Sequence, residues 1–561
     1  MTDLDPAPRA PASTVGHAWL WAGALAALLF LVPLAIDRPL LDPDEGLHAA
    51  IAREMAEGND WITPRFLGEP FLDKPILFFW AQAAALRLLG PSDTAVRLVG
   101  VLFGLLGAAT IGWLTCRVAG ARAGRLAAGF HTTMLLPLAL AHVAVHDIAL
   151  VPWATLTVLA GWQAVRAGGG ARGLFHAALG GVWVGLAMLT KGLSGVAIAG
   201  VTLAAWVVWT RRLSGWSVLV GAVVLGVGAV LAAPWYLAME AANPGYLHYF
   251  VVERHFLGFS TETQPHGTRP FWYYVPLLLG GALPWILAVP HARTTRTGQL
   301  EHRDAIVLGW AWLVGGTAFL SLASSKLVTY LLPVFPAVSL LAATAWDRWL
   351  AGGASPGRPR GLRTASRVAG AALGLALPAA LVAGTRLFGI PVPAGTWALA
   401  AAAAALGAWL ACAPPRQPGR ALAAWLVTAT AVQAIGLLAV LPAASRVFTA
   451  RELAAVLGRD GIPSRLWVFD ERVGSLVFYL DADLRRGLRP GQLAKIGPDV
   501  LLAMRQPPPD TLVAIPAEHL RRLEQRVDLS STPFTPAGGH RLYTAAAIHD
   551  AVRATLSHPD R

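Results

Sequence analysis

Four carboxylates and one lysine stand in two short polar segments near the start of the chain. The segments are residues 41–45 (LDPDE) and 71–76 (FLDKPI), about thirty residues apart. A carboxylate can take the proton of an attacking hydroxyl group, and an ammonium group can neutralise the charge that grows on a departing phosphate. Asp44 and Lys74 are therefore our candidates for a base and a phosphate ligand.

The first segment also has the pattern of a helix start. Asp42 as N-cap, Pro43 at the first position and Glu45 at the third would form a capping box, and Gly58 suits the C-terminal end. Capping would explain Asp42 and Glu45 without any chemistry. The cap does not require Asp44, which either catalysis or favourable electrostatics at the helix end would explain.

Lys74 and the pair His146-Asp147 have structural interpretations as well. Lys74 begins a short amphipathic stretch, residues 75–80, so it can extend its ammonium group to a lipid interface. His146 and Asp147 can form a polar loop tip, or Asp147 can orient a substrate or Lys74. None of these residues identifies a reaction by itself.

The elements that position these residues must lie in a membrane. The chain is 55% hydrophobic and 14% charged, and its mean hydropathy is +0.54. A span needs about 20 apolar residues, and the sequence supplies thirteen such stretches. They lie near residues 17–36, 95–116, 122–140, 147–165, 174–190, 193–210, 215–238, 271–290, 304–322, 327–346, 367–385, 393–412 and 421–443.

Arginines are concentrated in every second loop between the spans, and this pattern predicts the orientation of the chain in the membrane. Short cytoplasmic loops carry the excess of Lys and Arg, whereas the intervening loops hold only Lys191, Lys326 and Arg386. We therefore expect a multi-pass protein of a bacterial inner membrane, with a cytoplasmic N-terminus and a retained first span. The arginines of the other loops are Arg117, Arg122, Arg125, Arg166, Arg172, Arg211, Arg212, Arg293, Arg296, Arg303, Arg348, Arg358, Arg360, Arg363, Arg367, Arg416 and Arg420.

Three domains follow from this pattern: a cytoplasmic tail (1–16), a membrane domain (17–445) with long outer loops at 38–94 and 239–270, and a periplasmic domain (446–561). In the last domain, β-type runs at 465–469, 475–480, 500–503 and 511–515 and a helical pattern at 517–525 predict a small α/β fold. We expect this domain to act as a scaffold or cap.

Several function classes are disfavoured by composition. The net charge of +13 would suit nucleic-acid binding, but the arginines lie at expected membrane edges without interleaved aromatic residues. Cys116 and Cys412 form no disulfide framework. The sequence has no Walker loop after a strand and no His/Cys cluster with zinc spacing.

With this topology, the ionisable residues within or next to the spans gather on the outer side. Ionisable groups beside a membrane are usually functional, so we take this set as the candidate site. It consists of Asp44, Glu45, Asp73, Lys74, His146, Asp147, Lys191, Glu253, His255, His266, Lys326 and Tyr330.

Together these motifs resemble those of the membrane glycosyltransferases that use polyprenyl-phosphate sugars, a broad family with the bacterial aminoarabinose transferases of lipid A and the protein O-mannosyltransferases. The resemblance runs through residues 44–45, 52–55, 58–64, 73–76, 146–147, 190–192, 270–274, 284–285, 325–326 and 330–333. It implies a mainly α GT-C fold with about thirteen transmembrane helices and a soluble C-terminal domain.

The resemblance also implies roles for individual residues. Asp44 would be the carboxylate at the reaction centre, Lys74 and Tyr330 would face the carrier phosphate, and Asp147 would support the site near Lys74. The chain departs from the aminoarabinose branch at Leu47-His48, where an Arg-Tyr pair is usual, and at Asp73, where glutamate is usual. Further candidates for binding the carrier or substrate are Glu45, His48, Lys191, His255, His266 and Lys326, and a divalent metal could be held by Asp73, His255 and His266.

The predicted reaction is transfer of a sugar from an undecaprenyl phosphate carrier to a hydroxyl or phosphate acceptor on lipid A, another envelope glycoconjugate or a protein. The family resemblance implies inversion at the anomeric carbon. The rival from another class is a transporter or flippase of lipid-linked sugars. Transporters place binding groups near the bilayer midplane, often in internal repeats, whereas here the polar residues gather on one side and the halves show no repeat.

Overall fold

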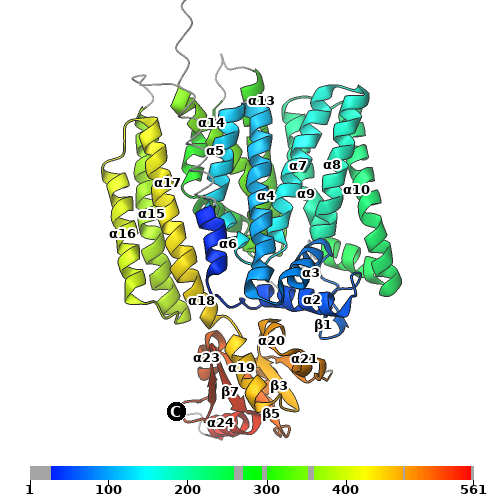
Figure 1. The fold of residues 1–561 in the computed structure, drawn as a ribbon, viewed down its shortest axis with the longest axis vertical. Helices are drawn as coiled ribbons and strands as arrows, with labels where there is room; N and C mark the ends of the chain where they lie inside the picture. The colour runs from blue at the N-terminus through cyan, green and yellow to red at the C-terminus, as the bar shows by residue number, and fades with distance from the viewer. Residues whose placement is uncertain are drawn as a thin grey trace, which may run out of the picture.

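The computed structural model describes residues 27–257, 269–293, 300–351, 359–471, 474–489 and 491–557. Most of these residues are helical and form a bundle, and a smaller domain with a β-sheet sits at one end of it (Figure 1). The elements of the bundle are η1 (Ala27–Leu31), η2 (Val32–Ala35), α2 (Asp44–Gly58), β1 (Arg65–Phe66), β2 (Glu69–Pro70), α3 (Leu77–Leu89), α4 (Asp93–Ala119), α5 (Ala121–Thr132), α6 (Leu135–Ala141), α7 (Asp147–Ala167), α8 (Gly170–Lys191), α9 (Leu193–Trp209), α10 (Gly215–Ala242), η3 (His248–Leu257), η4 (Phe271–Tyr273), α12 (Tyr274–Gly281), η5 (Trp285–His291), α13 (Leu300–Leu322), η6 (Val328–Val334), α14 (Phe335–Ala351), α15 (Pro359–Phe388), α16 (Ala394–Cys412), α17 (Pro418–Ile435), η7 (Gly436–Val440) and α18 (Leu441–Val447).

Nine helices in the described ranges are long and apolar enough to cross a membrane, or ten if the bent pair Phe271–Gly281 and Trp285–His291 is one span. Helix α9 is also apolar but has 17 residues. The expected span at 122–140 is divided between α5 and α6. All thirteen expected stretches thus fall on helical segments, except for the part of the first stretch that precedes residue 27.

The boundary between α8 and α9 lies where the sequence separates two apolar stretches by very few residues. Gly192 joins the helices with φ 66° and ψ −146°, a conformation that suits glycine because it has no Cβ. This turn ends α8 at Lys191, next to Asp147 at the start of α7.

The smaller domain is an α/β unit, as expected. Its sheet has the order β4-β3-β5-β7-β6, in which β3 is parallel to β4 and β5, and β7 is antiparallel to β5 and β6. Separate apolar clusters around Leu453 and around Leu523 pack helices against the sheet residues Leu466 and Val513. The elements are α19 (Arg451–Asp460), β3 (Arg465–Phe469), α20 (Gly474–Tyr479), α21 (Ala482–Arg486), β4 (Leu493–Ile496), α22 (Pro498–Leu502), β5 (Thr511–Pro516), α23 (Ala517–Glu524), β6 (Thr535–Ala537), β7 (His540–Thr544) and α24 (Ala545–Ser557).

Two of the expected strands are wrong. Residues 475–480 lie mostly in helix α20, and residues 500–503 overlap helix α22, whereas β3, β5 and α23 confirm the other expectations. Residues 475–480 are mostly apolar because α20 is buried from two sides: Leu476 packs in the smaller domain, and Phe478 packs against the bundle. Such a short apolar run does not distinguish a strand from a buried helix.

Helices α2 and α3 lie at the end of the bundle that faces the smaller domain, and α20 lies beside them (Figure 1). The face of α2 with Leu47, Ile51 and Met55 is buried in a cluster that includes Phe79 of α3 and Phe478 of α20. The candidate residues of segment 41–45 are thus held at the junction of the two domains.

Candidate active site

Helix α2 begins at Asp44, whose side chain is exposed, but the expected capping box is wrong. Pro43 occupies the N-cap position, and it makes no side-chain capping hydrogen bond to the helix. The carboxylate of Asp42 instead accepts hydrogen bonds from the backbone N–H and the hydroxyl of Ser475. Asp42 and Glu45, the two acidic residues that the local pattern assigned to the cap, therefore bind partners distant in the sequence instead.

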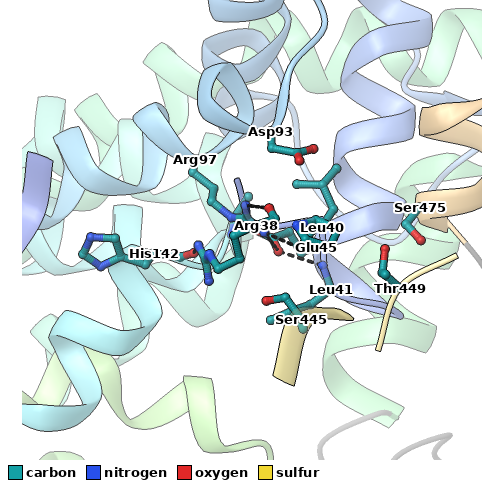
Figure 2. Close-up of polar contacts among 12 residues, drawn as sticks. Arg38, Leu40, Leu41, Glu45, Asp93, Arg97, His142, Ser445, Thr449 and Ser475 are labelled. Atoms are coloured by element: carbon teal, nitrogen blue, oxygen red, sulfur yellow. Dashed lines mark hydrogen bonds and ion pairs between the residues drawn. The ribbon is translucent and has the colours of Figure 1, made fainter. Parts of the chain in front are cut away.

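Glu45 is the second of these residues, and it forms a buried ion pair with Arg97 of α4 (Figure 2). Its Oε1 and Oε2 lie 2.8 Å from Nε and Nη2 of Arg97. They also accept the backbone N–H groups of Ala144 and Leu41, at 3.2 and 2.8 Å. Burial by itself raises the pKa of Glu45, but Arg97 and Arg38 outweigh it and lower the pKa below its ordinary value.

These contacts leave Glu45 no role at an open binding surface. The side chain is 1% exposed, and both of its oxygens are occupied by protein donors. The expectation that Glu45 binds carrier or substrate is thus replaced by a structural one. Its bonds tie the start of α2 to the loop before α7, which carries the next two candidates.

Asp147, the first residue of α7, is paired with Lys191 at the end of α8. Both side chains are largely buried. The ammonium group of Lys191 also lies 3.9 Å from the centre of the Tyr330 ring, which is a cation–π contact. The direct partner of Asp147 is therefore Lys191, whereas the sequence suggested Lys74.

Two histidines fill the space between α2 and α7. The rings of His48 and His146 have centroids 4.5 Å apart, and Phe79 lies 4.7 Å from His146. Burial lowers the pKa of His48, although the charge of Asp44 opposes this effect. His48 is therefore neutral near pH 7 and can serve as a hydrogen-bond partner.

Asp44 and Lys74 belong to the same cluster as the Asp147–Lys191 pair. The charges of Asp44, Lys74 and Asp147 all act on His48, and those of Asp44 and Lys74 also act on Lys191. The charge of Asp44 also acts on Tyr330. Segments near residues 44, 74, 147, 191 and 330 are thus brought together from five places in the sequence.

The sequence interpretation missed Arg254, although its neighbours Glu253 and His255 were candidates. Arg254 lies in η3, and its Nε is 3.5 Å from Oδ1 of Asp73. The same oxygen accepts the hydroxyl of Tyr249 at 2.6 Å, and burial together with this bond raises the pKa of Tyr249 to about 12. The charge of Arg254 also acts on Tyr330, so a guanidinium group does stand beside the site. Its position next to two ionisable residues in an outer loop was the available signal.

The remaining candidates lie elsewhere or have other partners. Lys326 is buried, and its ammonium group donates to the backbone oxygens of Arg269 and Ala323. Glu253 forms an exposed pair with His248 at 3.4 Å. The side chain of His255 and all of His266 lie outside the described residues.

A metal site stays a prediction, since two of its three expected ligands are not described. The described residues contain no group of three His, Cys, Asp or Glu side chains that could hold a metal ion. Asp73, the third expected ligand, is bound to Tyr249 and Arg254.

Comparison with known families gives a match to the sequence profile of dolichyl-phosphate-mannose-protein mannosyltransferases over residues 73–237. Curated relatives include two undecaprenyl phosphate-alpha-4-amino-4-deoxy-L-arabinose arabinosyl transferases. The chain is 32% identical to that of Erwinia tasmaniensis, over 56% of this chain and 57% of the relative. It is 33% identical to that of Pectobacterium atrosepticum, over 63% of each. The matched part thus spans about three fifths of these relatives' length.

Solved structures extend the similarity to nearly the whole chain. ArnT from Cupriavidus metallidurans, bound to undecaprenyl phosphate, has a TM-score of 0.72 and 22% identity, over 94% of this chain and 97% of that one. The archaeal oligosaccharyltransferase AglB from Archaeoglobus fulgidus has a TM-score of 0.53 and 13% identity, over 95% and 74%. At these identities the likeness is one of fold. The profile, the relatives and the fold together confirm that the chain is similar to the GT-C membrane glycosyltransferases that use polyprenyl-phosphate sugars.

Proposed function

We propose that the protein is a glycosyltransferase that moves a sugar from a polyprenyl phosphate carrier, such as undecaprenyl phosphate, to an acceptor at the outer face of a bacterial inner membrane. One observation carries the proposal: an exposed carboxylate, Asp44, shares a cluster with the cations Lys74 and Lys191 at one end of an apolar bundle. The curated relatives, which are named as undecaprenyl phosphate-aminoarabinose transferases, support the choice of donor.

The reaction forms a bond between the acceptor oxygen and the anomeric carbon and breaks the bond from that carbon to the phosphate oxygen. Asp44 takes the proton of the acceptor hydroxyl, and the electron pair of the broken bond stays on the phosphate. Lys74, Tyr330 and Arg254 stabilise the phosphate as its charge grows. Attack from the side opposite the phosphate inverts the anomeric centre.

Asp147 and Lys191 form the buried ion pair of this site. Their pair keeps one cation next to Tyr330 while Asp147 compensates its charge inside the protein. Nδ1 of His48 faces the carbonyl oxygen of Ala144 at 3.3 Å, so the neutral ring carries its proton there. Its Nε2 can then accept a hydrogen bond from the sugar or acceptor without adding charge.

For the acceptor, we favour lipid A or another envelope glycoconjugate, because the curated relatives described above belong to the aminoarabinose branch. A protein hydroxyl is the second candidate, and the match to the protein mannosyltransferase profile favours it. The cluster at one end of the bundle and the smaller domain at that end then face the periplasm, and the N-terminus faces the cytoplasm.

The proposal is tested with purified protein, a synthetic undecaprenyl-phosphate sugar and lipid A or an acceptor peptide. Asp44→Asn should abolish transfer while undecaprenyl phosphate still binds, and Lys74→Ala should weaken both. Glu69→Gln, which changes an exposed carboxylate in the hairpin near Lys74, is the matched control and should leave transfer intact. Full activity of Asp44→Asn would refute the proposed base. Movement of the donor across vesicles without any transfer would favour a transporter.

A further inference from the structure

Two glycines from distant parts of the chain bring the backbones of α2 and α20 into contact. A Cβ atom on Gly46 would lie 2.8 Å from Cα of Ser475, and a Cβ atom on Gly474 would overlap the backbone of Leu47. Cβ atoms in proteins essentially never lie within 3.0 Å of a non-bonded heavy atom. The smaller domain therefore touches α2 within one turn of Asp44, and only glycine fits on either side.

Hydrogen bonds fix this contact at the start of α2. The Asp42 carboxylate accepts the N–H of Ser475 at 2.9 Å and its hydroxyl. The hydroxyl of Ser475 in turn accepts the N–H of Ala450 at 2.8 Å. The first turn of α2 is thus linked both to α20 and to the segment that leaves the bundle.

Further contacts continue along α2. Arg53 donates to the carbonyl oxygens of Phe478 and Leu480. Glu57 accepts from Arg53 at 2.9 Å and also binds Arg485 of α21. Tyr479 donates to Asp93 at the start of α4, at 2.6 Å. The smaller domain therefore contacts α2 over most of its length and also binds the start of α4.

We propose that the smaller domain positions the active site: α20 clamps the first turn of α2 and thereby holds Asp44 in register with Lys74 and with the Asp147–Lys191 pair. Gly474, Ser475 and Asp42 are positioning residues in this scheme. This inference rests on the proposed function and gives the domain a role beyond that of a scaffold or cap.

The size of the effect follows from the tolerance of catalytic geometry. Shifting a reacting group by about 1 Å can lower a rate by about 100-fold. Relief of the overlap that a Cβ on Gly474 would create requires the two backbones to separate by a distance of this order. Because Lys74 and Tyr330 do not lie on α2, donor binding should change far less than turnover.

The test compares Gly474→Ala with Gly458→Ala in the full-length protein. Gly458 lies in α19 of the same domain, and a Cβ there meets no atom of the described part of the chain within 4 Å. Gly474→Ala should lower kcat by about 100-fold with little change in the KM for an undecaprenyl-phosphate sugar, while Gly458→Ala should match the wild type. A wild-type kcat in Gly474→Ala would overturn the inference.

A second pair of variants tests the same contact in case Gly474→Ala fails to fold. Asp42→Ala removes the acceptor for Ser475, whereas Asp42→Asn keeps one, so kcat should fall in the first and largely recover in the second. Equal kcat values in the two variants would contradict a positioning role for this bond.

Hydrogen exchange of α2 peptides separates the inference from the proposed function. Loosening α20 should speed exchange of α2 in Gly474→Ala relative to Gly458→Ala, whatever the reaction is. If the wild type transfers no sugar, the proposed function fails and exchange alone decides: faster exchange supports the clamp, and unchanged exchange overturns it.

Discussion

The buried pair of Glu45 and Arg97 allows a quantitative test of how the start of α2 is held. Two guanidinium groups, those of Arg97 and Arg38, lie near this one carboxylate, and their side chains are 3% and 2% exposed. Removing one partner of a buried ion pair costs about 3–5 kcal/mol, because the other charge stays buried and uncompensated. The two possible removals are not equivalent here.

Glu45→Gln should be the more damaging change. It leaves Arg38 and Arg97 facing each other, and Nη1 of Arg38 already has no hydrogen-bond partner among the described residues. Arg97→Met leaves Glu45 beside Arg38, so one charge is still compensated. We expect losses of unfolding free energy near about 5 kcal/mol for Glu45→Gln and about 3 kcal/mol for Arg97→Met.

The assay is equilibrium unfolding of the full-length protein in mixed detergent micelles, with the double variant completing a cycle. Since Glu45→Gln and Arg97→Met remove interacting groups, the double variant should lose less than the sum of the singles, by about 0.5–3 kcal/mol. Asp483→Asn, which breaks an exposed pair with Arg486, should leave stability unchanged. Additive losses, or a smaller loss for Glu45→Gln than for Arg97→Met, would refute this account of the charges.

Three further predictions concern the junction and the site. Burial raises the pKa of Asp42 from 3.8 to about 7. The stability that Asp42 contributes is therefore complete below about pH 4 and is lost as the pH rises through about 7. Melting temperatures should show this decline in the wild type and not in Asp42→Asn. Lys191→Met leaves the carboxylate of Asp147 unpaired, so unfolding and transfer assays should show losses of both stability and activity, and adding Asp147→Asn should restore stability alone. Arg254→Gln should raise the KM for the donor and weaken binding of undecaprenyl phosphate in a titration, since the charge of this guanidinium group acts on Tyr330.

The apolar pattern predicted the bundle well because spans are long and their hydrophobicity is local. The thirteen stretches fall on helices wherever the structure describes them, and the turn at Gly192 follows from one glycine. The smaller domain was harder to predict. Its helix α20 is mostly apolar because it is buried both within the smaller domain and against the bundle, and the sequence resembled a strand for that reason.

Local rules predicted the elements but misassigned the acidic residues at the start of α2. Asp42 and Glu45 have the spacing of a capping box, yet their partners are Ser475 and Arg97, which lie 433 and 52 residues away. A cap contributes about 1 kcal/mol, whereas leaving the buried guanidinium of Arg97 unpaired would cost several times as much. The ion pair therefore decides where the Glu45 carboxylate binds, and it depends on a contact that spacing within one helix does not show.

The contrast between local and long-range partners also determines which site residues the sequence could identify. Asp44 was separable from its neighbours because no local structure needed it, and the structure leaves its side chain exposed while Asp42 and Glu45 are bound. Arg254 was missed because its role depends on Asp73, about 180 residues earlier in the chain. A carboxylate without a local structural task is therefore the more informative sign of chemistry in this chain. On this reasoning, replacing Asp44 should cost activity with little loss of stability, whereas replacing Glu45 should cost both.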